Sequence, residues 1–165
     1  MSKSKNNFPK FEKYPLELWE KSIKINLTAA FLVAREVSNH LKKSKGSLVF
    51  ASSIYGIVAP DHRIYNGEKF KSISAYSATK AGVIGLARWL ATWLGEYSVR
   101  VNVVTPGGVF NNHTNKFNKK YSNRTPLNRM AKPEDLAGIM LFLMSDASNY
   151  ATGQNFIIDG GYTAL

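Results

Sequence analysis

The sequence contains no cysteine among its 165 residues. This excludes disulfide bridges, zinc sites built on thiolates and cysteine nucleophiles, although it does not identify a cellular compartment. No apolar run reaches the length of about 20 residues that a membrane-spanning helix needs. The polar start MSKSKNNFPK lacks the apolar centre of a signal peptide. We therefore expect a cytoplasmic protein without a membrane segment.

Acidic residues are scarce, because 11 Asp and Glu stand against 22 Lys and Arg and give a formal net charge of +11. An excess of this size permits binding to nucleic acids, acidic lipids or anionic metabolites. The basic residues are scattered, however, and form no basic helix, zinc-finger spacing or aromatic RNA-binding motif. We therefore expect neither a nucleic-acid partner nor a bound metal.

The length fits one domain of ordinary size, which we assign to residues 1–165. Residues 1–14 are polar and unpatterned enough to be disordered. The rest alternates between helical periodicity and short apolar runs such as Leu48–Ala51, which are typical of parallel strands buried on both faces. The expected helices are 15–45, 74–99 and one that begins at Pro133, and the expected strands are 46–53, 100–108 and 154–161.

This order predicts an α/β fold with about three parallel strands and long flanking helices, a partial Rossmann-like, doubly wound sheet. Two long connections remain, residues 54–73 and 109–131, and both are expected to be loops. Because long connections in compact domains are usually functional or mobile, they are candidates for a binding site.

The helix expected over 74–99 carries Tyr76 and Lys80 at positions i and i+4, which places both side chains on one face. An ammonium group beside a phenol stabilises the phenolate, so this tyrosine is a candidate for proton transfer. The alternative is a core tyrosine beside a lysine whose ammonium reaches solvent. A second Tyr-x-x-x-Lys pair, Tyr65 and Lys69, has Gly67 in its middle and is not expected to be helical.

Two further polar features are candidates for the same site. Asn26 lies inside an apolar helical stretch, so it is either a structural hydrogen bonder or part of a site. Ser52 and Ser53 follow the strand that contains Leu48, where open α/β sheets bind their ligands. Turn or capping roles would also explain the two serines.

In order and spacing, these motifs resemble the short-chain dehydrogenase/reductase family. The resemblance runs from about Leu16 to Tyr162. The segments that carry it are Asn26, the ASS that contains Ser53, SAYSATK with Tyr76 and Lys80, VNVVTPGGV and ATGQNFIIDGG.

The resemblance implies an NAD(P)-dependent oxidoreductase that interconverts a secondary alcohol and a ketone. Tyr76 would be the catalytic acid/base and Lys80 its activator, and both would also contact the cofactor. Ser53 would hydrogen-bond the substrate oxygen, and Asn26 would hold a water in the proton relay. The cofactor supplies the hydride chemistry in such enzymes.

The resemblance also implies cofactor contacts from Pro106, Gly107 and the main chain of Val109. The fifth position after this proline is often threonine in the family and is Asn111 here. The connection between Ser53 and Tyr76 is longer than is usual in the family. Together with PGGVFNN, it is similar to dehydrogenases of bacterial surface-sugar and flagellin-modification pathways. This narrower resemblance implies a sugar or sugar-nucleotide substrate, which the basic loops would suit if it is anionic.

The family's N-terminal strand and glycine-rich turn, which cradle the cofactor pyrophosphate, have no counterpart in this sequence. The chain is therefore expected to be a truncated domain, and NAD cannot be distinguished from NADP. The alternative function is an inactive remnant, or a non-catalytic subunit that needs another chain to complete its sheet. The resemblance further implies a homo-oligomer, a dimer or tetramer, to which Trp89 and Trp93 would contribute unless they belong to the core.

Overall fold

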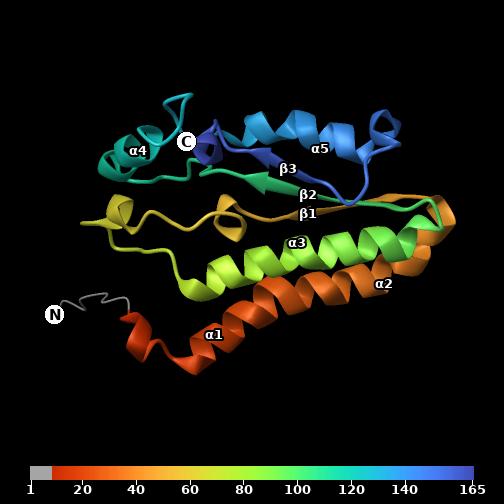
Figure 1. Cartoon of the computed structure of the whole chain (residues 1–165), viewed down its shortest axis with the longest axis horizontal. Helices are drawn as coiled ribbons and strands as arrows, with labels where there is room; N and C mark the ends of the chain where they lie inside the picture. Colours follow the sequence, from red (N-terminus) through yellow and green to blue (C-terminus); the bar gives the residue numbers. More distant parts are fainter. Residues whose placement is uncertain (1–8) are drawn as a thin grey trace.

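The computed structural model describes residues 9–165, which form a three-layer α/β arrangement (Figure 1). Its sheet has three parallel strands in the order β1-β2-β3. The strands are β1 (Ser47–Ala51), β2 (Arg100–Pro106) and β3 (Asn155–Ile158). Helices α2 and α3 cover one face of the sheet, and α5 covers the other. The predicted fold class and all three predicted strands are confirmed.

The N-terminal helical stretch is continuous but contains one irregular turn. Helix α1 (Leu16–Ile23) passes into a π-helical turn (Lys24–Thr28) and then into α2 (Ala29–Ser44). Lys45 then adopts a left-handed conformation with φ of 53°, which ends the helix before β1. The sequence predicted the extent of this helix but not the π turn, which contains Asn26.

The prediction of disorder over residues 1–14 stays untested. Residues 1–8 lie outside the described part of the chain. Phe11–Lys13 form a single 3₁₀ turn that buries no side chain.

Helix α3 (Ser74–Gly95) is the principal helix of the core. Val83, Ala87, Leu90 and Leu94 lie on one face, and each is at most 8% exposed. They pack with β1 and β2 residues in one hydrophobic cluster. Burying a Val or Leu side chain stabilises a fold by about 1.5–3 kcal/mol. This stripe therefore fixes α3 on the sheet, as its spacing predicted.

The connection over 109–131 is not the loop that the sequence analysis expected, because it contains α4 (Asn115–Ser122). The Thr114 hydroxyl caps this helix by accepting a hydrogen bond from the Phe117 N–H. Phe117 and Tyr121, at i and i+4, are buried on its inner face. The five Asn and Lys residues of this helix leave only one apolar pair, which is too little to show a helical period in the sequence.

The connection over 54–73 contains no α-helix or strand, as expected, but it is not featureless. It forms two 3₁₀ turns, Ile54–Gly56 and His62–Tyr65, and buries the tyrosine of each. The predicted helix from Pro133 is present as a 3₁₀ turn (Pro133–Leu136) followed by α5 (Ala137–Met144). No helix in the described residues combines the length and apolarity needed to cross a membrane.

Among the described residues, β1 pairs on one side only, with β2. A groove lies along β1 and the adjoining helices, and its lining is almost entirely apolar. The lining residues are Asn26, Ala29, Ala30, Val33, Ala34, Leu48, Val49, Phe50, Ala51 and Val83. Within the described residues, β1 is therefore an edge strand that is bordered by a largely apolar groove.

Gly56 allows a close approach that the fold depends on. A Cβ at this position would lie 2.7 Å from the backbone carbonyl carbon of Lys80 in α3. We predict that Gly56→Ala lowers the free energy of unfolding by about 1–3 kcal/mol, because the turn must move away from the helix. Urea denaturation followed by circular dichroism would measure this.

Gly85 provides the matched control, because a Cβ there would meet nothing within 4 Å. Gly85→Ala should stabilise the exposed face of α3 by about 0.5–1 kcal/mol. Equal effects of the two substitutions would contradict the proposed packing of Gly56 on α3.

Candidate functional site

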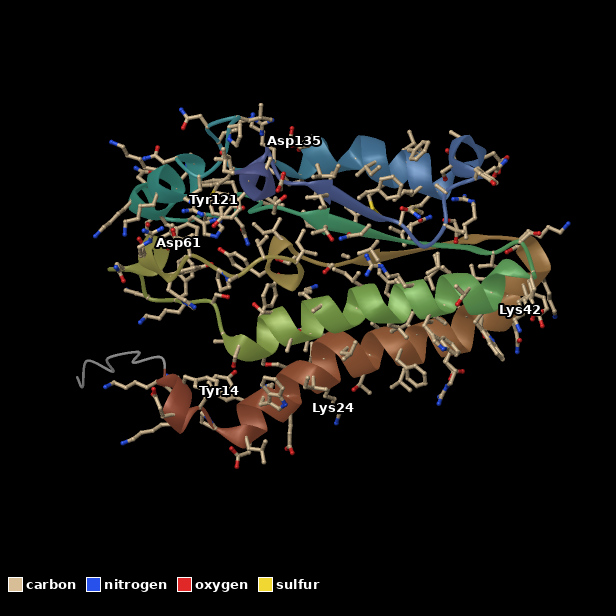
Figure 2. The ribbon with its side chains drawn as sticks, viewed as in Figure 1. Tyr14, Lys24, Lys42, Asp61, Tyr121 and Asp135 are labelled. Atoms are coloured by element: carbon tan, nitrogen blue, oxygen red, sulfur yellow. The ribbon has the colours of Figure 1, made fainter. Side chains whose placement is uncertain are left out.

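The cavity that Ser53 and Tyr76 both line, referred to below as the main cavity, lies where β1 and β2 end. Its volume is about 460 Å³, and Figure 2 shows Tyr121, one of its lining residues, at this end of the molecule. The carboxyl ends of parallel strands are the usual ligand-binding edge of an open α/β sheet. The lining residues are Ser52, Ser53, Ile54, Tyr55, Tyr65, Phe70, Lys71, Ser72, Ile73, Tyr76, Pro106, Gly107, Gly108, Val109, His113, Phe117, Tyr121 and Met130.

The two serines after β1 have different hydrogen-bonding roles. The Ser52 hydroxyl donates to the Lys80 carbonyl oxygen at 2.8 Å, so its hydrogen is used within the fold. The Ser53 hydroxyl accepts from the Tyr55 N–H at 3.2 Å, and it donates no hydrogen bond within residues 9–165. Ser53 therefore retains a donor at the cavity, which it lines together with Tyr76.

Lys80 lies one turn after Tyr76 on α3. Its Nζ is 5.7 Å from the centre of the Tyr76 ring and donates to the Ala51 carbonyl oxygen at 3.0 Å. Burial lowers the pKa of Lys80, because the charged form loses solvation. An ammonium group has three hydrogens. Since Nζ has only this acceptor in the described chain, two hydrogens remain for a ligand.

Asn26 approaches the same part of α3 from the π-helical turn. Its side-chain nitrogen donates to the Thr79 hydroxyl at 3.4 Å, and that hydroxyl donates to the Tyr76 carbonyl oxygen at 2.9 Å. Single π turns inside α-helices are frequently found at functional sites. Asn26 does not line the main cavity, and its hydrogen bonds connect it to Tyr76 through Thr79, so its role in a proton relay stays a prediction.

The predicted cofactor-contacting residues divide into two groups. Pro106, Gly107 and Val109 line the cavity at the end of β2. Asn111 does not, and its N–H donates to the ring Nδ1 of His113 at 3.1 Å. The structure therefore gathers Ser53, Tyr76 and the first group at one cavity, with Lys80 behind the tyrosine.

Sequence reasoning missed the aromatic wall of this cavity. Tyr55, Tyr65, Phe117 and Tyr121 are each at most 9% exposed and form a hydrophobic cluster, against which Phe70 packs. The i, i+4 spacing of Phe117 and Tyr121 was the available signal. Tyr65 had been noted only as part of a second Tyr-x-x-x-Lys pair, and the expected absence of a helix there is confirmed.

His113, which also lines the cavity, is half-buried, and its ring stacks on Phe117 with a centroid distance of 5.0 Å. His62, in the 54–73 segment, is exposed.

Several loop cations that were candidates for binding an anion are used within the fold. Arg63 and Arg124 both pair with Asp61, at 2.8 and 3.0 Å. Lys120 donates to the Asn66 carbonyl oxygen at 2.7 Å. Among the lysines and arginines of the described chain, Lys71 alone is in the cavity lining.

Asp61 fastens the 54–73 segment to the region after α4 (Figure 2). Its side chain is only 12% exposed and bridges Arg63 and Arg124. The hydrogen bond from Arg63 lowers the pKa of Asp61 to about 2 from its usual 3.8. The carboxylate is therefore charged at any pH where the protein would work. Within residues 9–165, no three His, Asp or Glu side chains gather in a way that would hold a metal ion.

Comparison with known proteins gives a family match over nearly the whole chain. Residues 3–163 match the family model described as enoyl-(acyl carrier protein) reductase. The flagellin post-translational modification protein A of Campylobacter coli is 35% identical over 142 residues, covering 86% of this chain and 56% of that protein. The sorbose reductase of Schizosaccharomyces pombe is 38% identical over 151 residues, and this match covers 88% of this chain and 56% of that protein.

Among solved structures, a short chain dehydrogenase from Leptospira borgpetersenii with bound NAD⁺ superposes with a TM-score of 0.87 at 38% identity. The match covers 95% of this chain and 61% of that one. The chain thus spans a little over half the length of the curated relatives it matches.

We predict that Asp61→Asn lowers the free energy of unfolding by about 1 kcal/mol at pH 7, because two arginines lose a charged partner. The Asp61 pKa is depressed in the folded state, so its contribution is complete above about pH 4 and is lost as pH falls toward about 2. Urea denaturation at several pH values should show the two proteins converging over that range.

The exposed Asp146, which has no ion pair among the described residues, provides the control. Asp146→Asn should leave stability nearly unchanged at pH 7. A stability difference between wild type and Asp61→Asn that persists unchanged at pH 2 would contradict the assigned role of Asp61.

Proposed function

The chain belongs to the short-chain dehydrogenase/reductase family, and from that premise we propose that it is the catalytic part of an NAD(P)-dependent oxidoreductase. The reaction interconverts a secondary alcohol and a ketone. The observation that carries the proposal is the cavity that Ser53 and Tyr76 share, with the Lys80 ammonium held behind the tyrosine ring.

The geometry supports separate roles for Ser53, Tyr76 and Lys80 in the reaction. The free hydrogen of Ser53 binds the substrate oxygen and orients it toward Tyr76. In the oxidation direction the Tyr76 oxygen takes the proton of the alcohol, and in reduction the same hydroxyl returns it to the ketone oxygen. The Lys80 ammonium stabilises the Tyr76 phenolate, which is the form that accepts the proton in oxidation and the form left after the proton is given up in reduction.

NAD(P), when bound, supplies the acceptor or donor of the hydride. The residues present fit the nicotinamide and its ribose. Lys80 has two free hydrogens for ribose hydroxyls, and Pro106 and Gly107 offer an apolar wall at the cavity. Asn111 is a weaker candidate, because it is exposed and outside the cavity lining. The described residues contain no glycine-rich strand-to-helix turn for the pyrophosphate, so they do not choose between NAD and NADP.

A sugar or related polyol is the substrate class we propose. The relatives include a sorbose reductase and a D-arabinitol 2-dehydrogenase, although 3-oxoacyl-[acyl-carrier-protein] reductases are also among them. The cavity lining contains Lys71 and no carboxylate, which favours an anionic derivative of such a substrate. We place this chemistry in the cytoplasm.

We also propose a homo-oligomer, a dimer or tetramer. Trp89 and Trp93 stack on each other at 5.4 Å on the outer side of α3 and are 57% and 58% exposed. Their exposure rules out the alternative that they belong to the core of the chain. Exposed aromatic pairs of this kind are typical of surfaces that a second subunit covers.

The open edge of β1 favours a second candidate function. The groove beside this edge is lined by small and apolar side chains, which suit pairing with a strand of another polypeptide. In this function the chain would be a non-catalytic subunit, or an inactive remnant of the enzyme, that folds against that polypeptide. Such a protein would keep the cavity but would show no turnover.

The test of the proposed reaction is Tyr76→Phe. In the form of the protein that turns over sugar alcohols or ketoses with NAD(P), this change should lower kcat by about 100-fold or more, because the proton acceptor is lost. Tyr150→Phe, at an exposed tyrosine, should leave kcat unchanged. Turnover retained in Tyr76→Phe would contradict the assignment, and a folded wild type inactive with both cofactors would favour the second function.

A further inference from the structure

The 54–73 segment builds one side of the main cavity, to which it contributes Ile54, Tyr55, Tyr65, Phe70, Lys71, Ser72 and Ile73. The two tyrosines are buried, and the Tyr65 hydroxyl donates to the Tyr55 oxygen at 2.9 Å. Burial raises the pKa of both phenols, so both remain neutral hydroxyls.

The hydrogen bonds of this pair are incomplete. Each phenol carries one hydrogen. Tyr65 uses its hydrogen on Tyr55, whereas the hydrogen of Tyr55 has no acceptor among residues 9–165. Since Tyr55 lines the cavity, a bound molecule can supply the missing acceptor.

Ser72 carries a second hydroxyl whose hydrogen has no acceptor among the described residues. Its Oγ is buried and has no hydrogen-bond partner within the described chain, and the residue lines the same cavity. A buried polar group without a partner is rare in native proteins, and it usually marks a place that a ligand or an ordered water completes. One segment therefore brings two hydroxyls with unused hydrogens to a cavity wall that is largely aromatic.

We propose that Tyr55 and Ser72 bind a hydroxyl group of the substrate that is remote from the reacting carbon, and that the Tyr55–Tyr65 pair makes the site selective for polyhydroxylated substrates. The position of the reacting carbon rests on the proposed function. Ser53 and Tyr76 hold the reacting oxygen, and the 54–73 segment recognises a second oxygen.

The aromatic side chains around Tyr65 also contribute to substrate selectivity. Phe70 and Phe117 lie 5.0 Å apart by centroids, and each packs on Tyr65. These aromatic side chains can pack against the C–H groups of a substrate ring. The Tyr55 and Ser72 hydroxyls, in turn, find a hydrogen-bond partner only if that ring carries a hydroxyl group. A site built to hydrogen-bond a substrate hydroxyl discriminates strongly against an analogue that lacks it, because its own polar groups then stay unpaired. An alkyl or acyl chain is such an analogue.

The test compares cyclohexane-1,4-diol with cyclohexanol, which share a ring and differ by one remote hydroxyl. Binding to the whole 165-residue chain is followed by the methyl resonances of ¹³C-labelled methionine. Met130 lines the cavity, and Met140 and Met144 on α5 report on unrelated change. The diol should shift Met130 with a Kd about fivefold or more below that of cyclohexanol.

Three variants test which side chains cause the preference for the diol over cyclohexanol. Tyr55→Phe and Ser72→Ala should each reduce the ratio of the two Kd values, Tyr55→Phe to near one. Tyr162→Phe is the matched control, because it deletes another buried hydroxyl without a partner in the described residues but outside the cavity lining. It should leave the ratio unchanged.

Equal Kd values for the two probes in the wild type would overturn the proposal. So would an unchanged ratio in both Tyr55→Phe and Ser72→Ala, or a Met130 resonance that neither probe shifts. Because this assay needs no cofactor or turnover, its result is separate from that of Tyr76→Phe. A diol preference in a protein without oxidoreductase activity would uphold this inference and contradict the proposed reaction.

Discussion

The site depends on the contact between the carboxyl end of β1 and α3. Three interactions meet at Lys80: its Nζ donates to the Ala51 carbonyl, its own carbonyl accepts from the Ser52 hydroxyl, and its backbone leaves no room for a Cβ on Gly56. These contacts set the distance between the strand end and the helix. As a result, Ser53 and Tyr76, which are 23 positions apart in the printed sequence, line one cavity.

The same contact explains why the second serine is the better candidate for binding substrate. Ser52 is committed to the strand–helix junction through its hydroxyl hydrogen, whereas Ser53 has its hydrogen free. Asn26 and Thr79 brace the helix from the other side, through the π turn. The polar residues that look costly in apolar stretches of the sequence are thus satisfied within the fold or directed to the cavity.

The sequence was sufficient for the elements whose pattern is long and regular. The stripe on α3 and the apolar runs of the three strands predicted the sheet and its main helix, because burial alone decides those elements. It was not sufficient for α4, whose apolar signal is the single pair Phe117 and Tyr121. Nor could it give the wall from Tyr55 and Tyr65, since that wall forms only when a loop without periodicity folds over the sheet.

The central claim is that the described residues form the nicotinamide half of an oxidoreductase site. The most direct measurement titrates the 165-residue chain with reduced nicotinamide riboside, which carries the nicotinamide and its ribose alone, and follows the anisotropy of its fluorescence. We expect saturable binding that Lys80→Ala weakens about tenfold, because charge-assisted hydrogen bonds to the ribose are lost. Lys119→Ala, at an exposed lysine of α4, should have no effect. Absence of binding by folded protein, or equal affinity in Lys80→Ala, would contradict the central claim.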